Sequence, residues 1–146
     1  MSPPAEPDRG PAQFDLVDSH AHLDGPEFDG DRAEVLARAR AAGVRRIVCV
    51  GAGADLATAE RAVALAEAEP DVWATVGIHP HDVARMEPGW WPTITALARR
   101  PRVVAVGETG LDYHYDFAPR ERQREVFAWH LAAAARFGKP VVIHAR

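Results

Sequence analysis

The sequence predicts an α/β fold, with a parallel sheet built from repeated strand–helix–strand units. Short apolar segments alternate with longer segments of helical spacing, which gives five expected strands and four intervening helices. Most of the apolar segments lack polar alternation, as is typical of strands covered on both faces. Metal-binding residue types follow strand after strand, and no glycine-rich nucleotide fingerprint follows the first. These features favour a partial TIM (β/α)₈ barrel, with the first five strands and four helices, over a doubly wound sheet.

The elements of the first third of the chain follow from local signals. Residues 1–13 are rich in proline, glycine and charge, and predict a flexible leader. An apolar run that ends in polar residues predicts a strand over 14–19. Helical spacing predicts a helix over 32–42, with Gly43 as its C-terminal stop. A continuous apolar run predicts the second strand over 46–51.

The middle of the chain repeats this alternation. A helix is expected over 56–69, because Pro70 disfavours its continuation. Apolar runs predict strands over 72–78 and 103–107, and helical spacing predicts a helix between them over 90–100.

The last unit has clear boundaries. The longest helix is expected over 119–137, with Pro119 near its first turn and Gly138 after its last. The final apolar run predicts a strand over 141–144. Residues 14–146 are therefore expected to form one unit, the N-terminal part of a barrel.

Composition limits the possible functions. The 146 residues are 47% hydrophobic with a formal net charge of −4, which argues against binding nucleic acid by charge alone but not against a metal site that binds phosphate. The single cysteine, Cys49, excludes an internal disulfide. No apolar run approaches the roughly 20 residues of a membrane helix, and the N-terminus lacks the features of a signal peptide. A cytoplasmic protein without membrane association is expected.

Histidines and a carboxylate gather where the predicted strands end. His20 and His22 should project to the same side of the first strand as Asp18, because strand side chains alternate. Glu108 follows the fourth apolar run, and His144 ends the fifth. Since the carboxyl ends of barrel strands meet at one face, these side chains should converge on a divalent metal site. Glu108, between two ligand groups, is placed to bridge two ions.

Four segments in order resemble the TatD family of metal-dependent deoxyribonucleases. They are Asp18–Asp24, Gly77–His81, Gly107–Tyr113 and Pro140–Arg146, the last preceded by Gln123, Phe127 and Leu131 at helical spacing. The resemblance extends over residues 14–146. It implies a TIM-barrel hydrolase that cleaves DNA phosphodiesters, including 3′→5′ exonuclease action, with two divalent ions such as Mg, Mn or Zn.

The resemblance also implies roles for single residues. His20 and His22 would be ligands of one ion, His144 a ligand of the second, and Glu108 a shared ligand and the catalytic residue. His79 and His81 match a motif near the site, and Arg146 matches a position that contacts phosphate. We expect these three residues to be substrate-binding, and we do not assign the two histidines as ligands.

Two alternatives remain open. A small-molecule amidohydrolase would need a bridging lysine on the fourth strand, yet the only lysine, Lys139, precedes the fifth. A non-catalytic truncated fragment is the other, because family members carry a further histidine and aspartate in their second half and a (β/α)₈ barrel needs about 250 residues. Five strands should leave two open edges, so we expect low activity together with self-association or a place in a longer protein.

Overall fold

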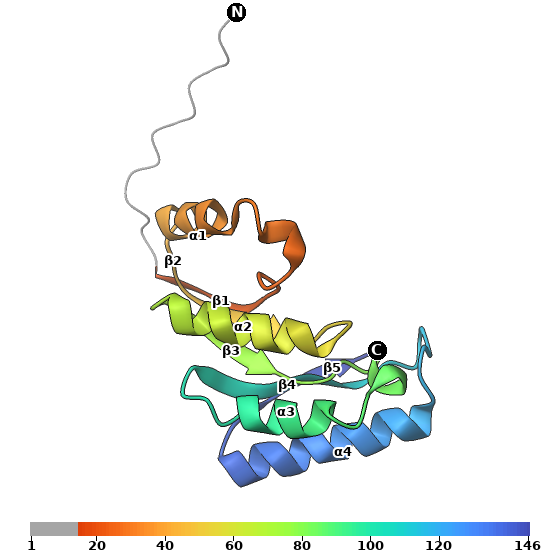
Figure 1. Cartoon of the computed structure of the whole chain (residues 1–146). Coiled ribbons are helices and arrows are strands. Elements are labelled where there is room, and N and C mark those ends of the chain that lie inside the picture. The colour runs from red at the N-terminus through yellow and green to blue at the C-terminus, as the bar shows by residue number, and fades with distance from the viewer. Residues whose placement is uncertain (1–14) are drawn as a thin grey trace, which may run out of the picture.

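A curved parallel sheet forms the framework of the molecule. The computed structural model describes residues 15–146, so the predicted leader lies outside the described residues. The five strands are parallel and lie in the order β1-β2-β3-β4-β5 (Figure 1). Their bounds are β1 Leu16–Ala21, β2 Val44–Gly51, β3 Val72–Val76, β4 Val103–Leu111 and β5 Val141–Ala145. Each strand therefore neighbours the next one in the sequence, as in a barrel.

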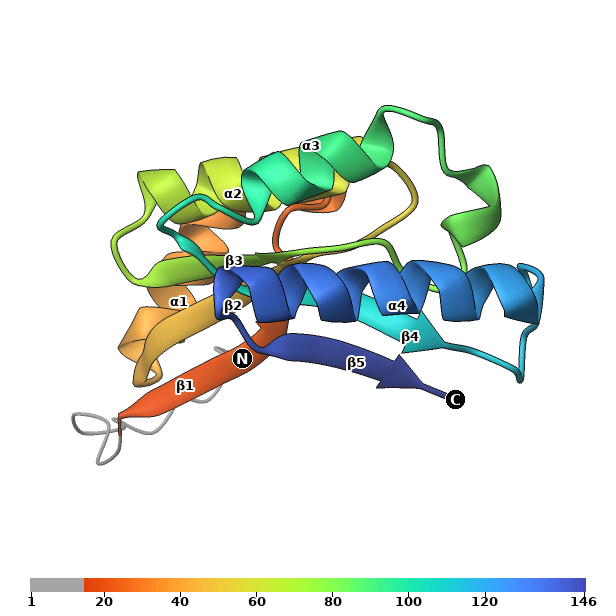
Figure 2. The same cartoon turned by 90° about the horizontal axis from the view of Figure 1, so that it is seen from below.

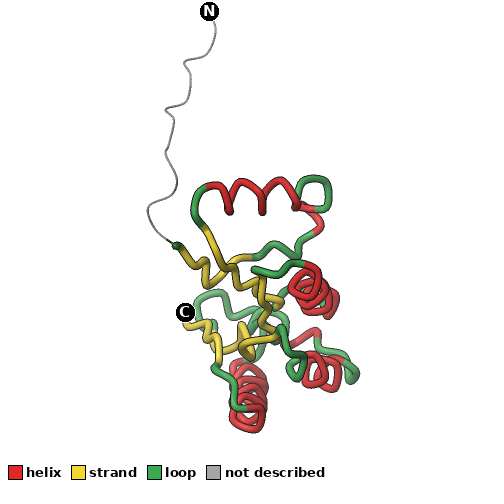
Figure 3. Tube along the Cα trace, turned by 90° about the vertical axis from the view of Figure 1, so that its left-hand side faces the viewer, coloured by secondary structure: helices red, strands yellow, loops and turns green. Residues whose placement is uncertain are grey.

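Four α-helices connect the strands and cover one face of the sheet. They are α1 Arg32–Ala41, α2 Leu56–Ala68, α3 Trp90–Leu97 and α4 Arg120–Phe137, with two short 3₁₀ helices, η1 Pro26–Phe28 and η2 Val83–Arg85. Figure 3 shows the helices arranged in an arc around the sheet, which curls away from them. This half-barrel of five strands and four helices confirms the predicted fold class.

Local chemistry explains where the helices begin and end. The Asp55 carboxylate accepts a hydrogen bond from the backbone N–H of Thr58, so it caps the N-terminus of α2. Gly138 follows α4 in the left-handed conformation, at φ 63°, which a residue without a Cβ adopts without strain. Among residues 15–146, no helix is both long and apolar enough to span a bilayer.

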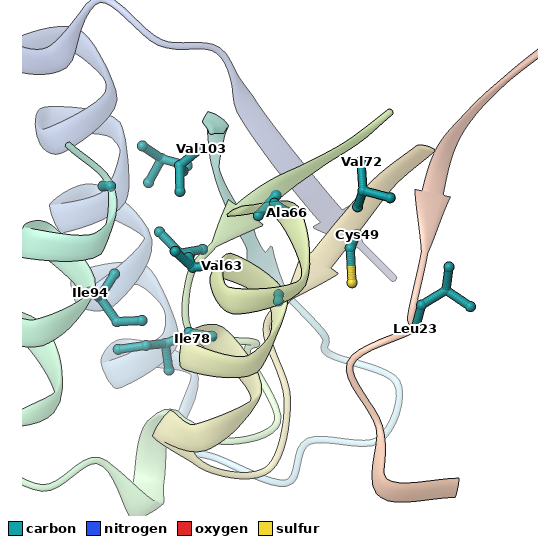
Figure 4. Close-up of a cluster of buried hydrophobic side chains, with 14 of the residues drawn as sticks. Leu23, Cys49, Val63, Ala66, Val72, Ile78, Ile94 and Val103 are labelled. Carbon is teal, nitrogen blue, oxygen red and sulfur yellow. The ribbon is translucent and has the colours of Figure 1, made fainter. Parts of the chain in front are cut away.

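The core lies between the sheet and its helices (Figure 4). Val63 of α2, Ile94 of α3, Val72 of β3 and Val103 of β4 are all buried and belong to one hydrophobic cluster. Cys49 is also fully buried, and this burial raises the pKa of its thiol to about 11. It therefore behaves as a small apolar residue, as expected.

The outer strands differ from the prediction that apolar strands without polar alternation are covered on both faces. Leu16 and Val17 of β1 are 49% and 58% exposed, and Ile143 of β5 is 58% exposed. These strands end the sheet, so each has a neighbour on one side only, and Figure 2 shows both on the side away from α2 and α3. The two open edges were expected; the exposure of the edge strands corrects the prediction.

Some element boundaries also need correction. β1 continues to Ala21 and β4 to Leu111, so His20 and Glu108 lie within strands rather than just after them. β1 is irregular between Asp18, which pairs with Ile47, and Ala21, which pairs with Cys49. The extra residue is a bulge, which local hydrophobicity does not reveal.

Candidate metal centre

Two glycines let β4 pass close to β5 on either side of Glu108. Gly107 and Gly110 have φ angles of 121° and 140°, which side chains rarely allow. A Cβ at Gly107 would collide with the carbonyl oxygen of Val142, and one at Gly110 with that of His144. The Gly-Glu-Thr-Gly pattern thus brings the Glu108 carboxylate against the end of β5.

Glu108 lies between two sets of histidines. One carboxylate oxygen, Oε2, is 3.5 Å from His20 Nε2, and the other, Oε1, is 3.0 Å from His144 Nδ1. His79 Nε2 lies 3.8 Å from Oε1. The carboxylate therefore has one oxygen toward β1 and the other toward β5, as a ligand shared between two ions requires.

His20 and His22 approach each other at the end of β1. Their Nε2 atoms are 3.3 Å apart, and together with Glu108 they offer three potential ligand atoms within 4.8 Å of one another. His22 Nδ1 lies 3.1 Å from the carbonyl oxygen of Val50, an atom that only accepts hydrogen bonds. His22 therefore carries its proton on Nδ1, and its Nε2 presents a lone pair to the site.

Asp112 sets the orientation of His144. Its side chain is fully buried, and its Oδ2 lies 2.9 Å from His144 Nε2 and 2.6 Å from His81 Nε2. Both imidazoles donate to this carboxylate, so the Nδ1 lone pair of His144 faces Glu108. Burial by itself raises the pKa of Asp112, but the N–H of Tyr115 and the two imidazoles outweigh it and hold the pKa below its usual range.

His79 presents a proton to the same place. Its Nδ1 accepts a hydrogen bond from the backbone N–H of His81 at 3.2 Å, so Nε2 carries the proton and donates to His144 Nδ1 at 3.2 Å. Burial lowers the pKa of His79 to about 4, which keeps the ring neutral near pH 7. His79 is thus a donor in this structure, whereas His22 and His144 present lone pairs.

The donor set fits divalent metal ions. Glu108 Oε1 and His144 Nδ1 lie 3.0 Å apart, so one cation could take both atoms as ligands. Neutral imidazole nitrogens with a carboxylate suit Zn and Mn, and Mg through the carboxylate. The chemistry of the residues therefore agrees with the predicted cofactors.

Other predicted residues make contacts with groups other than the Glu108 carboxylate. Asp18 accepts a hydrogen bond from the backbone N–H of His20 at 3.1 Å. The guanidinium carbon of Arg146 lies 5.3 Å from the centre of the Tyr115 ring, at the rim of the site. His81 meets Asp112 rather than Glu108, so it belongs to the layer behind His144.

Three buried polar residues behind the site were not predicted to be site residues from the sequence. Besides Asp112, they are Gln123 and His130 of α4, which are 1% and 0% exposed. Gln123 accepts from the N–H of Asp112 at 2.8 Å, and His130 Nε2 accepts from the N–H of Ile78 at 3.0 Å. Polar residues seven positions apart on an otherwise apolar helix face could have indicated this layer.

Lys139 lies at the opposite end of the sheet. Its ammonium donates to the carbonyl oxygens of Ala98 and Val103 at 2.5 and 2.6 Å, and burial lowers its pKa. The only lysine of the chain is therefore held far from Glu108 by its own hydrogen bonds. This disfavours the amidohydrolase alternative that uses a bridging lysine.

A half-barrel with histidines and a carboxylate at the carboxyl ends of its strands is typical of metal-dependent hydrolases with a barrel fold. The family model described as TatD related DNase matches residues 17–146, and the chain belongs to this family. The resemblance noted in the sequence is thus confirmed.

Similar proteins include an uncharacterized metal-dependent hydrolase, YabD of Bacillus subtilis, which is 41% identical over 90% of this chain and 51% of its own length. The 3′-5′ ssDNA/RNA exonuclease TatD of Edwardsiella piscicida is also 41% identical, over 90% of this chain and 50% of its own. The crystal structure of YjjV, a TatD homolog from Escherichia coli, superposes with a TM-score of 0.80 at 36% identity, over 90% of this chain and 51% of that one. The chain thus spans about half the length of these relatives.

Proposed function

We propose that this chain carries a two-metal centre for hydrolysis of phosphodiester bonds in DNA. The position of Glu108, with one oxygen toward His20 and the other toward His144, is the observation that carries the proposal. A carboxylate shared in this way suits two ions about 3.5–4 Å apart. His20, His22 and Glu108 would hold one ion, and Glu108 and His144 the other.

The bound ions, Mg, Mn or Zn, would supply positive charge to a phosphate oxygen and lower the pKa of a bound water. The residues around them do the rest. The Val50 carbonyl holds the His22 ring with its lone pair inward, and Asp112 does the same for His144. These partners fix the ligand geometry before any ion binds, which strengthens binding.

Substrate contacts are proposed for residues that present donors. The Nε2–H of His79 donates to His144 Nδ1 and lies 3.8 Å from Glu108 Oε1, and it could donate to a phosphate oxygen instead once a metal ion takes the His144 lone pair. Arg146, at the rim, is placed for a neighbouring phosphate rather than for the one that is cleaved. His81 would act by sharing Asp112 with His144.

The substrate is proposed to be single-stranded DNA cleaved from its 3′ end. The relative from Edwardsiella piscicida is described as a 3′-5′ ssDNA/RNA exonuclease, which supports both the chemistry and the polarity. Since this chain spans about half of that relative, we expect lower turnover from residues 1–146 alone than from a complete barrel.

The test compares metal binding and nuclease activity in the wild type and in Glu108→Gln. We expect Mn²⁺ to bind the wild type, measured by calorimetry, and to support cleavage of a 3′-labelled DNA oligonucleotide. Glu108→Gln should lose both, whereas Glu60→Gln, at an exposed position on α2, should lose neither. Equal Mn²⁺ affinity in wild type and Glu108→Gln would overturn the proposed centre. Binding without cleavage would favour the non-catalytic alternative.

A further inference from the structure

Two aromatic side chains are unusually exposed beside the metal centre. Tyr115 and Phe117, in the loop between β4 and α4, are 48% and 63% exposed. Their rings are stacked, with centroids 5.3 Å apart and planes inclined by 17°. In Figures 1 and 2 this loop lies at the same end of the molecule as the C-terminus and η2. Within residues 15–146 no core packing covers these two rings, which leaves them available to a ligand.

A single side chain, that of His81, lies between the aromatic pair and the proposed ligands. The His81 ring meets both rings edge-on, at 5.6 Å from the Tyr115 centroid and 4.9 Å from that of Phe117. His81 in turn shares the Asp112 carboxylate with His144. A molecule that rests on these rings would therefore lie next to the centre, on the solvent side of His81.

Cationic groups flank the aromatic pair. A shallow hollow beside Phe117 is lined by His81, Asp82, Ala84 and Arg85. The Arg85 side chain is 61% exposed, and the Arg146 guanidinium carbon is 5.3 Å from the Tyr115 centroid. Arg85 donates to the Asp82 carboxylate, which balances its charge within the hollow, while Arg146 places a cation against the Tyr115 ring. Aromatic faces flanked by arginines are the combination that binds unpaired bases together with their phosphates.

We propose that Tyr115 and Phe117 form a stacking platform for an unpaired nucleobase of a single-stranded nucleic acid. This inference rests on the proposed function, since the phosphate beside that base would reach the Glu108 centre. A base inside a duplex is stacked on its neighbours and offers no free face, so the platform selects single strands or frayed ends. Stacking tolerates any base, because every base has a π-face.

The test separates base contacts from phosphate contacts. The full chain is titrated with two fluorescent oligonucleotides in Mn²⁺ at a temperature that suppresses turnover: one of thymidines, and one of equal length with abasic sites in place of the bases. The wild type should bind the thymidine strand more tightly. Phe117→Ala should weaken that binding by about 5- to 150-fold, as loss of one stacked base does, and leave binding of the abasic strand unchanged.

Two further variants make the result specific. Phe117→Trp should restore binding, because it supplies another aromatic face, while Leu131→Ala, at an exposed apolar position on α4, should change nothing. Equal loss of affinity for both strands in Phe117→Ala, or no loss for either, would overturn the platform. If neither strand binds the wild type, the proposed function fails as well. If both bind equally and only with Mn²⁺, the centre stands and the platform alone is wrong.

Discussion

The polar side chains at the two ends of the sheet differ in their hydrogen-bond partners. At the amino-terminal end, Lys139 donates to the carbonyls of Ala98 and Val103, and Arg102 donates to those of Ala66 and Glu69 at 2.8 and 2.9 Å. At the carboxyl end, Glu108 Oε1 and His144 Nδ1 lie 3.0 Å apart at the candidate metal centre. One end is satisfied by the chain itself, and the other is arranged for a cation.

This difference separates stability from function. Buried donors that meet carbonyls stabilise the fold, because leaving those carbonyls without partners would cost free energy. Imidazole rings and a carboxylate gathered at one place are suited to bind a cation, and the surrounding structure must hold them in that geometry. In barrel folds the carboxyl ends of the strands carry activity and the amino ends stability, and this half-barrel shows the same division. Variants at the two ends should therefore affect different measurements.

The largest effect is expected at Glu108. Glu108→Ala should lower Mn²⁺ affinity in calorimetry by more than about 100-fold, because both ions lose a ligand and the charge between them. His79→Ala should weaken Mn²⁺ binding less, because His79 presents a proton. Equal affinities for the two variants would contradict the bridging role of Glu108.

Lys139→Met should produce the opposite pattern. It leaves the carbonyls of Ala98 and Val103 without their donor, and we expect a loss of about 3 kcal/mol in the free energy of unfolding, measured with urea. Mn²⁺ affinity at the far end of the sheet should change by less than about twofold. Arg136→Met, at an exposed position on α4, serves as the control and should leave stability nearly unchanged. A loss of metal affinity in Lys139→Met would show that the two ends are coupled.

Asp112→Asn tests the carboxyl end of the sheet at the oxygen that accepts a hydrogen bond from His144 Nε2. The amide can still accept from the backbone N–H groups of His114 and Tyr115, but its NH₂ group then faces His144 Nε2. His144 should adopt the other tautomer, with a proton on Nδ1, and Mn²⁺ affinity should fall by about 10- to 100-fold. Nitrogen chemical shifts of the metal-free imidazoles would report the tautomer directly. Asp116→Asn in the same loop should leave both measurements unchanged.

The smallest effect is expected at an ion pair of the amino-terminal end. Arg40 donates to both oxygens of Asp71 at 2.8 and 2.6 Å and lowers the pKa of that carboxyl. Asp71→Asn should cost about 1 kcal/mol at pH 7. Because the folded pKa lies below the unfolded value, the pair stabilises the fold above the unfolded pKa of about 3.9. Its contribution is lost as the pH falls through the folded pKa, so wild type and variant should converge in urea unfolding near pH 2.

The sequence predicts the fold well because its signals are local. Apolar runs, Pro70 and Gly138 mark the elements to within a few residues, and their alternation implies parallel pairing. Exposure of β1 and β5 could not follow from hydrophobicity, since Leu16, Val17 and Ile143 read as core residues and their exposure depends on how the strands are arranged in the sheet.

The sequence predicts which residues form the candidate site, but not which nitrogen of each histidine ring carries the proton. His20, His22, Glu108 and His144 stand out by their type and by their position near strand ends, and the structure brings them together. Their roles as ligands remain a prediction. The partners that fix each ring, such as the Val50 carbonyl and Asp112, depend on contacts between segments distant in sequence. No spacing rule predicts which ring nitrogen will be protonated.

The strand order gives the candidate centre a mechanical consequence. His20 and His22 belong to the end of β1, at one edge of the sheet, while Glu108 belongs to β4, with β2 and β3 between them. An ion held by all three residues would link β1 directly to β4 across the concave side of the sheet. It would therefore fix the curvature of the sheet. Its binding free energy would then resist flattening of the sheet as well as unfolding. Chelation should let this half-barrel relax toward an open, flatter shape whose radius of gyration is measurably larger.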